Sequence, residues 1–216
     1  MSLELSGTTG VKGVAGSVSA PSIVGDDTNT GISFPAADTI KFSTGGVERM
    51  SITNSGVTGP ALGITEFDQW YLSADQSSNG DVTSNLSRDN FTANASPLGT
   101  GMTESSGVFT FPSTGKWVVL VQATFNLAGN DNVVLYIKVT TNNSSYNIIN
   151  MLVDGQTGSS SENKHGSTMG LSFIDVTDTS QVKVKFEVGS INSGSNLHGR
   201  TDRVTTGFNF IRIGDT

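Results

Sequence analysis

The chain contains no cysteine, and this absence excludes several classes of protein at once. Without thiols there is no disulfide framework, no thiolate metal site and no cysteine nucleophile. A run of about 18 apolar residues, as a membrane-spanning helix needs, is also missing, so we expect no membrane insertion. The first residues, Met-Ser-Leu-Glu-Leu-Ser-Gly, lack the basic start and apolar stretch of a signal peptide. We therefore expect a protein that is not exported by that route and that is stabilised by packing or by assembly.

Charged residues are few, at 14% of the chain, and acidic ones predominate. The net charge is −7 and the isoelectric point is near 4.6, while the twelve basic residues are scattered along the chain. A surface that binds nucleic acid without sequence preference needs clustered Lys and Arg to displace counterions from phosphates. We therefore expect no nucleic-acid partner. Ser, Thr and Asn take the place of Lys and Glu, a composition common in secreted or virion β proteins.

What the chain does contain is a series of strands with one apolar face. Every odd residue from Trp117 to Phe125 is apolar, and every even residue from Val182 to Val188 is apolar. This alternation indicates strands with one side buried in a core. Helical periodicity is absent, so the predicted fold class is all-β. The predicted strands beyond residue 60 are 66–75, 108–111, 116–127, 132–140, 145–153, 168–176, 181–189 and 203–213.

The spacing of these strands resembles that of a known superfamily. A motif F-x-x-P-x-x-G spans 109–115 and precedes the long strand led by Trp117, and the chain closes on Thr205-Thr-Gly-Phe-Asn-Phe-Ile-Arg-Ile213. Both features resemble the jelly roll of the tumour-necrosis-factor and complement globular-head superfamily. The resemblance implies a two-sheet jelly-roll β-sandwich, and relatives in this superfamily pack around a threefold axis.

Residues 1–60 show neither helical periodicity nor a long strand. They hold only brief alternating pieces, divided by Gly and Asn-Ser-Gly turns. Pieces of three to five residues do not bury a core within one chain, so we expect three chains to wrap round one axis and to supply the missing pairing and burial. Pro60 and the glycines before it indicate a hinge or sharp turn. We therefore predict an N-terminal Gly-rich arm and short-strand stalk over 1–60 and a jelly-roll head over 61–216.

The stalk segment carries the most specific resemblance in the chain. Asp27-Thr-Asn-Thr-Gly-Ile-Ser-Phe-Pro-Ala-Ala-Asp-Thr-Ile-Lys-Phe-Ser-Thr-Gly-Gly-Val-Glu-Arg-Met-Ser-Ile-Thr-Asn-Ser-Gly56 is similar, almost without gaps, to a segment of fibre and appendage proteins of tailed phages, especially marine ones. The resemblance implies a homotrimeric protein of the virion surface, made in the cytoplasm of the host bacterium.

Apolar residues outside the core faces are the candidates for contacts between chains. Strand 132–140 leaves Tyr136 on the face opposite its core residues, and the last strand similarly leaves Ile211 and Ile213 opposite Phe208 and Phe210. A monomer would expose such groups to water. The predicted trimer interface comprises Ile32, Phe34, Ile40, Phe42, Tyr136, Ile211 and Ile213. The candidate residues for attachment to other virion proteins are Leu3, Leu5, Val11 and Val14.

Catalytic and metal-binding patterns are scarce. A serine hydrolase would have to use His165 or His198 as its base, yet no G-x-S-x-G elbow exists, and His165 is expected in a polar turn within 154–167. Thr114-Gly-Lys-Trp117 lacks the upstream glycine of a phosphate loop. Acidic turns such as Asp75 to Asp81 offer oxygen ligands for calcium but lack D-x-D-x-D-G spacing. We expect no catalytic site, no cofactor and no metal, with a calcium ion as the alternative.

Two functions fit these observations. The first is a trimeric head decoration (cement) protein or short fibre, anchored by its N-terminal arm with the head projecting outward. The second is a tail-fibre receptor-binding protein whose loops adhere to a host-cell glycan or protein. Loops rich in Asn, Ser and Gly suit hydrogen bonding to sugars, and the candidate receptor residues there are Asn192, Asn196, His198, Arg200 and Asp202.

Overall fold

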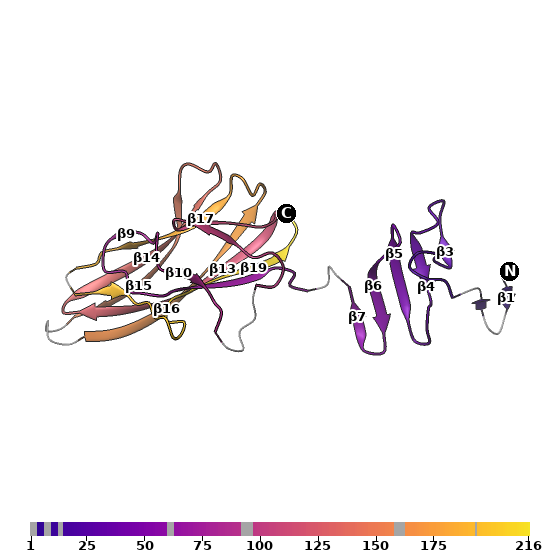
Figure 1. The fold of residues 1–216 in the computed structure, drawn as a ribbon, viewed down its shortest axis with the longest axis horizontal. Coiled ribbons are helices and arrows are strands. Elements are labelled where there is room, and N and C mark those ends of the chain that lie inside the picture. Colours follow the sequence, from indigo (N-terminus) through magenta and orange to yellow (C-terminus); the bar gives the residue numbers. More distant parts are fainter. Residues whose placement is uncertain are drawn as a thin grey trace. The chain divides into compact units, whose positions relative to one another are not determined.

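The computed structural model describes residues 15–59, 63–91, 97–157, 164–192 and 194–216, and the backbone alone of 4–6, 10–12 and 163. The chain divides into two compact units, residues 1–63 and residues 64–216 (Figure 1). The elements of the described residues are all strands. The predicted all-β class is therefore confirmed.

The first unit contains one five-stranded antiparallel sheet in which every strand pairs with its neighbour in sequence. Its strands are β3 (Ile23–Val24), β4 (Gly31–Ser33), β5 (Ile40–Thr44), β6 (Val47–Thr53) and β7 (Gly56–Thr58). Two further short strands, β1 (Glu4–Ser6) and β2 (Gly10–Lys12), pair with each other. The backbone pairing that we expected from neighbouring chains is thus supplied within the chain, because short connections, two of them two-residue turns, bring consecutive strands side by side.

The turn between β5 and β6 shows why the local sequence folds in this way. Thr44 pairs with Val47, which leaves Gly45 and Gly46 as the two turn residues, and both have positive φ, 60° and 75°. Glycine is the residue that adopts this backbone conformation at little cost, and the resulting turn matches the twist of the flanking strands. The Thr-Gly-Gly-Val sequence therefore fixes the register of the longest hairpin in this unit.

The second unit is a sandwich of two antiparallel sheets (Figure 1). The first sheet has the order β10-β8-β19-β13-β16, with β18 also paired to β13, and the second has the order β11-β12-β17-β14-β15, with β9 paired to β17. The strands are β8 (Phe67–Leu72), β9 (Gly80–Asp81), β10 (Leu86–Arg88), β11 (Thr103–Ser105), β12 (Val108–Thr110), β13 (Gly115–Ala128), β14 (Asp131–Thr140), β15 (Asn147–Gln156), β16 (Asn163–Val176), β17 (Lys183–Gly189), β18 (Asn196–Leu197) and β19 (Gly207–Gly214).

Each predicted head strand has a counterpart in this sandwich, with different ends in some cases. The last strand begins at Gly207 rather than 203, and β16 begins at Asn163 rather than 168. Four short strands, β9, β10, β11 and β18, were not predicted. They contain two or three residues each, which is too short for alternation to be recognised.

The core lies between the two sheets and is built from the predicted apolar faces. The alternate apolar residues from Trp117 to Phe125, on β13, are almost completely buried. The same holds for those from Val182, which directly precedes β17, to Val188. Phe186 of one sheet stacks on Phe208 of the other, with ring centroids 4.2 Å apart. Aromatic rings supply large apolar areas and prefer such offset or edge contacts, so this pair stabilises the packing of the two sheets against each other.

One buried carboxylate links three segments of the head. Asp68 on β8 is 2% exposed and accepts two hydrogen bonds from the guanidinium of Arg88 on β10. Its Oδ2 also accepts from Trp70 Nε1 at 2.8 Å and from the backbone N–H of Met102 at 2.7 Å. A buried charge is tolerated when it is paired and hydrogen-bonded in this way.

Candidate functional site

The outer face of the β8–β19–β13–β16 sheet is largely apolar. Residues paired across neighbouring strands lie on the same face, and one such row joins Phe67, Ile211, Val118 and Phe173. The next row places Leu120 beside Leu171. We call this surface the head apolar face and define it by Phe67, Val118, Leu120, Met169, Leu171, Phe173 and Ile211.

The most exposed part of the head apolar face lies on β16. Phe173 is 71% exposed, Met169 63% and Leu171 47%, although a soluble surface usually carries such residues singly rather than in a row. Toward the end of the same strand, the alternate residues Ile174 and Val176 are buried in the core. Both faces of this strand are therefore apolar.

The polar groups of the same rows are hydrogen-bonded to each other or to backbone. Gln69 Nε2 donates to Asn209 Oδ1 at 2.8 Å, and Asn209 Nδ2 donates to the carbonyl of Leu120 at 3.2 Å. At the rim of this face, Lys116 forms an ion pair with Asp175. Because its amides already have partners within the chain, this face loses few hydrogen bonds when it is removed from water.

The outer face of the other sheet carries charged residues on β9, β14 and β17, and exposed Met151 and Val153 on β15. Lys138 of β14 is paired with Glu187 of β17, and Lys185 lies 2.6 Å from Asp81 of β9. Tyr136 lies on this face, opposite Glu187 in the ladder. The structure therefore places Ile211 on the head apolar face and Tyr136 on the other sheet. Ile213, 54% exposed, lies at a register shift of β19 and has no ladder partner.

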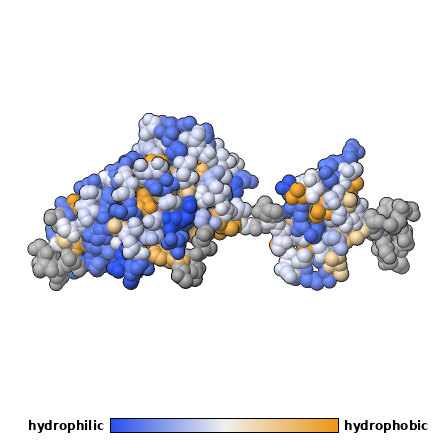
Figure 2. Space-filling view, in the orientation of Figure 1, coloured by the Kyte–Doolittle hydropathy of each residue, from blue (hydrophilic) through white to orange (hydrophobic). Residues whose placement is uncertain are grey.

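The sheet of the N-terminal unit also has an apolar face. Ladder partners join Ile23 to Ile32, Ile32 to Phe42 and Phe42 to Met50, and a second row joins Ile40, Ile52 and Val57. We call these seven residues the stalk apolar face. Phe34 lies beside it, 42% exposed, and lines a groove with Ile40 and Ile52. Figure 2 shows hydrophobic residues at the surface of this unit.

At the β18 end of the head, His198 forms the centre of a polar cluster. Its Nδ1 lies 2.8 Å from Asp75 Oδ1 and 3.0 Å from Asn126 Nδ2, and Asn126 Nδ2 donates to Asn196 Oδ1 at 2.9 Å. His165 faces this cluster, with its ring centroid 5.9 Å from that of His198.

The position of His165 corrects a sequence expectation. Residues 154–156 belong to β15 and residues 163–167 belong to β16, so His165 is a strand residue paired with Asn126 and not part of a polar turn. The sequence did not predict these strand ends, because both strands extend beyond their apolar segments into polar sequence.

Arg200 and Asp202 line a shallow polar hollow beside His198. The hollow is lined by Ser73, Asp75, His198, Gly199, Arg200, Thr201 and Asp202. Arg200 Nε donates to Asp202 Oδ1 at 2.7 Å, and Arg203 donates to Asp202 Oδ2 at 2.7 Å. These hydrogen bonds hold the pKa of the Asp202 carboxyl well below its usual range and raise the pKa of Arg200.

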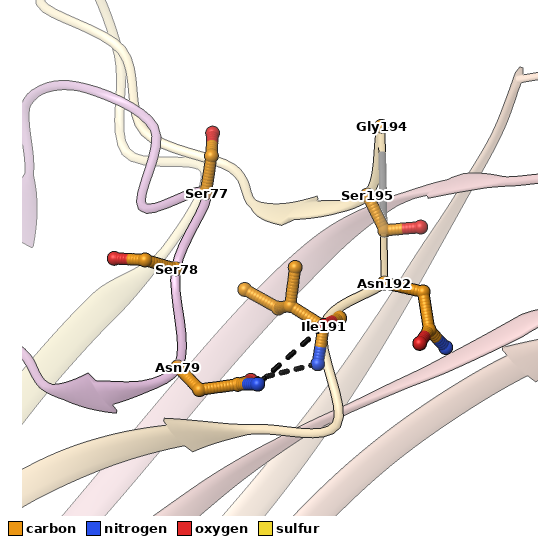
Figure 3. A pocket seen from close by; sticks show the side chains of 7 residues that line it. All are labelled: Ser77, Ser78, Asn79, Ile191, Asn192, Gly194 and Ser195. Carbon is orange, nitrogen blue, oxygen red and sulfur yellow. Dashed lines mark hydrogen bonds between the residues drawn. The ribbon is translucent and has the colours of Figure 1, made fainter.

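Asn192 belongs to a neighbouring hollow, shown in Figure 3. There the side chain of Asn79 bonds to both backbone groups of Ile191. Asn192 Nδ2 donates to the buried carboxylate of Asp131 at 2.5 Å. Burial raises the pKa of Asp131, but hydrogen bonds from Ser195 and Asn192 outweigh burial, so this pKa lies below its ordinary value.

The candidate attachment residues fall outside the side chains that the structure describes. Leu5 of β1 and Val11 of β2 are paired in the backbone ladder, while Leu3 and Val14 lie outside the described residues. Within the described residues, no three acidic or histidine side chains are grouped closely enough to hold a metal ion. The same part of the chain has no helix long and apolar enough to cross a membrane.

Known structures share the fold of the head. The crystal structure of murine APRIL at pH 8.5 aligns with a TM-score of 0.50 at 10% sequence identity, covering 68% of this chain and 98% of that one. The structure of Eiger TNF from S. frugiperda aligns with a TM-score of 0.50 at 13% identity, covering 69% and 93%. No protein-family model and no curated protein matches the sequence. The head is thus a TNF-like jelly-roll β-sandwich, as its sequence predicted.

Proposed function

We propose that this protein is a homotrimeric structural component of the virion surface of a tailed phage, a head decoration (cement) protein or a short fibre. Its N-terminal arm attaches to other virion proteins, and its jelly-roll head projects outward. The observation that carries the proposal is the head apolar face, in which exposed Met169, Leu171 and Phe173 lie beside paired rows of apolar and amide side chains. The proposal includes no catalytic role.

The head apolar face is suited to contacts between copies because its exposed apolar side chains lie in adjacent rows beside internally bonded amides. The other outer face carries ion pairs such as Lys138 with Glu187, next to exposed Met151 and Val153 on β15. Burial of apolar surface contributes about 25 cal/mol per Å², and a specific interface buries roughly 800 Å² per partner. A contact between copies through this face would place the charged sheet in water.

The placement on a phage particle is supported by the resemblance of residues 27–56 to phage appendage segments. In the structure this segment contains most of the N-terminal sheet, from β4 to β6. The fold of the head does not distinguish among functions, because one fold hosts many. Residues 27–56 and the candidate attachment residues Leu3, Leu5, Val11 and Val14 therefore carry the virion part of the proposal.

The proposal is tested in two steps. Sedimentation equilibrium of the full chain at micromolar concentration is expected to give three subunits, and a single subunit would refute the trimer. Purified capsids and tails are then incubated with the labelled trimer and imaged by electron microscopy. Threefold knobs over the capsid indicate decoration, knobs at the tail alone indicate a fibre, and the absence of binding to either refutes the virion role.

A second candidate function is adhesion to a host-cell surface. It is favoured by the hollow at His198 and Arg200, which gathers hydroxyl, carboxylate and guanidinium groups at one exposed place. A glycan array and a cell-adsorption assay with the full chain test it, with Arg200→Ala as the variant and Lys116→Ala, on the rim of the head apolar face, as the control. Binding that only Arg200→Ala abolishes supports adhesion, and no binding by the wild-type chain refutes it.

A further inference from the structure

The only two histidines of the chain lie together at one place on the head. His165 is on β16, and His198 directly follows β18. Both strands pair with β13, where Asn126 is the ladder partner of His165 on one side and of Asn196 on the other. The two imidazole rings have their centroids 5.9 Å apart and their planes inclined by 64°. The pairing of three strands therefore brings the two rings together.

His198 is held in place by its backbone. Its N–H donates to the carbonyl of Thr124 at 2.8 Å, and its carbonyl accepts hydrogen bonds from the hydroxyls of Thr205 and Thr206, at 2.9 and 2.8 Å. Its side chain is 17% exposed, whereas His165 is an exposed strand residue. One imidazole is thus fixed in position, and the other lies at the surface, where it can turn toward the first.

The ring nitrogens of the two histidines differ in their partners. Nδ1 of His198 lies 2.8 Å from Asp75 Oδ1 and 3.0 Å from Asn126 Nδ2, and every polar contact that this ring makes with described residues involves Nδ1. The ring of His165 has no hydrogen-bond partner among the residues that the structure describes. Nε2 of His198 and the two nitrogens of His165 are therefore available to a ligand.

The separation of the two rings suits a shared metal ion. A metal-bound imidazole nitrogen lies about 2.0 to 2.1 Å from the ion, so the centroid of its ring lies about 3.2 Å from the ion. Two such rings have centroids about 5.2 Å apart in a tetrahedral site and about 6.4 Å apart on opposite sides of the ion. The observed 5.9 Å lies between these values, so a small rotation of His165 suffices for both rings to bind one ion.

We propose that His165 and His198 bind a divalent transition-metal ion, Cu²⁺, Ni²⁺ or Zn²⁺, with water in the remaining positions. Imidazole nitrogen is a ligand that these ions share, whereas Ca²⁺ and Mg²⁺ prefer oxygen. When Nε2 of His198 binds the ion, its Nδ1 carries the proton, and Asp75 Oδ1 at 2.8 Å accepts that proton in a hydrogen bond, as carboxylates behind metal-bound histidines do.

A bound ion would connect the start of β16 to the segment after β18. Because it binds the folded head and not the unfolded chain, it would stabilise the fold in proportion to its occupancy. All of the groups come from one chain, so the site does not depend on the proposed assembly. Two protein ligands are fewer than the three or four of most zinc sites, and we therefore expect an ion that exchanges with the solution.

The test uses the full chain without a histidine tag, freed of metal by a chelator. Calorimetric titration with Zn²⁺ should show a single ion per chain, and Cu²⁺, Ni²⁺ and Zn²⁺ should each raise the melting temperature while Ca²⁺ and Mg²⁺ do not. His165→Ala and His198→Ala should each abolish this rise. Asp75→Asn should weaken the affinity about 10- to 100-fold. The matched control is Asp202→Asn, which removes a carboxylate from the same hollow and should leave the affinity unchanged.

The electron paramagnetic resonance spectrum of the wild-type chain with one equivalent of Cu²⁺ provides a readout that does not depend on the folding of any variant. It should show two imidazole nitrogens bound to the ion. A spectrum with one nitrogen or none would overturn the inference, as would an affinity that His165→Ala leaves unchanged. Binding of Ca²⁺ in preference to Zn²⁺ would also overturn it, because oxygen ligands would then hold the ion.

Discussion

Phe173 offers the sharpest test of the head apolar face. It is the most exposed of the large hydrophobic residues that the structure describes, at 71%. Complete burial of a phenylalanine side chain contributes about 1.5 to 3 kcal/mol. About seven-tenths of that contribution remains available for an interface, which amounts to roughly 1 to 2 kcal/mol per chain and roughly 3 to 6 kcal/mol for three chains.

The substitution Phe173→Ala should therefore raise the dissociation constant of the trimer by a factor of about 10² to 10⁴. Sedimentation velocity over a dilution series from micromolar to nanomolar concentration measures this change. The matched control is Ile148→Ala, since Ile148 is 54% exposed but pairs with Lys138 on the charged sheet. The control should leave the dissociation constant unchanged, because a surface substitution outside an interface alters free energies by about 0.5 kcal/mol or less.

The thermal stability of the dissociated chain completes this test. If Phe173 is buried only between copies, Phe173→Ala should not lower the melting temperature of the dissociated subunit. A variant that dissociates no more readily than the wild-type chain would refute the reasoning, as would one that loses stability as a monomer.

Three further predictions concern the stability of the head. Arg88→Ala leaves the carboxylate of Asp68 buried without its cation and should lower the free energy of unfolding by about 3 kcal/mol in urea titrations; a loss below about 1 kcal/mol would contradict the structural role of the pair. Gly107 has φ 84° and an added Cβ would lie 2.2 Å from a backbone oxygen, whereas Gly80, φ 127°, faces open space. In urea titrations Gly107→Ala should thus lower the free energy of unfolding by about 3 kcal/mol or more, against about 1 to 2 kcal/mol for Gly80→Ala. Equal losses would show that the close approach of the Cβ to the backbone oxygen does not matter. The pKa of Asp131 is lowered on folding, so its ionised carboxylate stabilises the folded state. This stabilisation is fully present above the unfolded pKa of about 4 and is lost as the pH falls through the lower folded pKa. Asp131→Asn should cost about 1 to 3 kcal/mol at pH 7 and less at pH 3, measured by thermal unfolding at both pH values; an equal cost at both would contradict the assignment.

The fold of the head was predictable because its core residues alternate without interruption. In the strands from Trp117 and from Val182 the alternation identifies the buried side directly, and the structure buries those residues almost completely. Strand ends were less predictable, since β15 and β16 continue through polar sequence around His165. Backbone hydrogen bonds to the neighbouring strands, β14 for β15 and β13 for β16, extend both strands without any hydrophobic pattern in the sequence.

The candidate surfaces were only partly predictable. Ile211 was recognised because its strand carries aromatic core residues on one face, but Phe173 was missed. Strand β16 has apolar residues on both faces, so periodicity alone does not show which face is buried. The pairing of Val118 with Phe173 and Ile211, which assembles the head apolar face, joins segments distant in sequence. Such register is not visible in any local pattern.

The position of β19 has a consequence for the order of synthesis. This strand, residues 207–214, lies between β8 and β13 in the middle of its sheet, so a nascent chain interrupted before residue 207 lacks the strand that joins them. The N-terminal sheet, which pairs only neighbours in sequence, can form while the ribosome is still translating the head. Truncated chains would thus carry a finished N-terminal unit without a closed sandwich, and proteases would remove such incompletely folded chains.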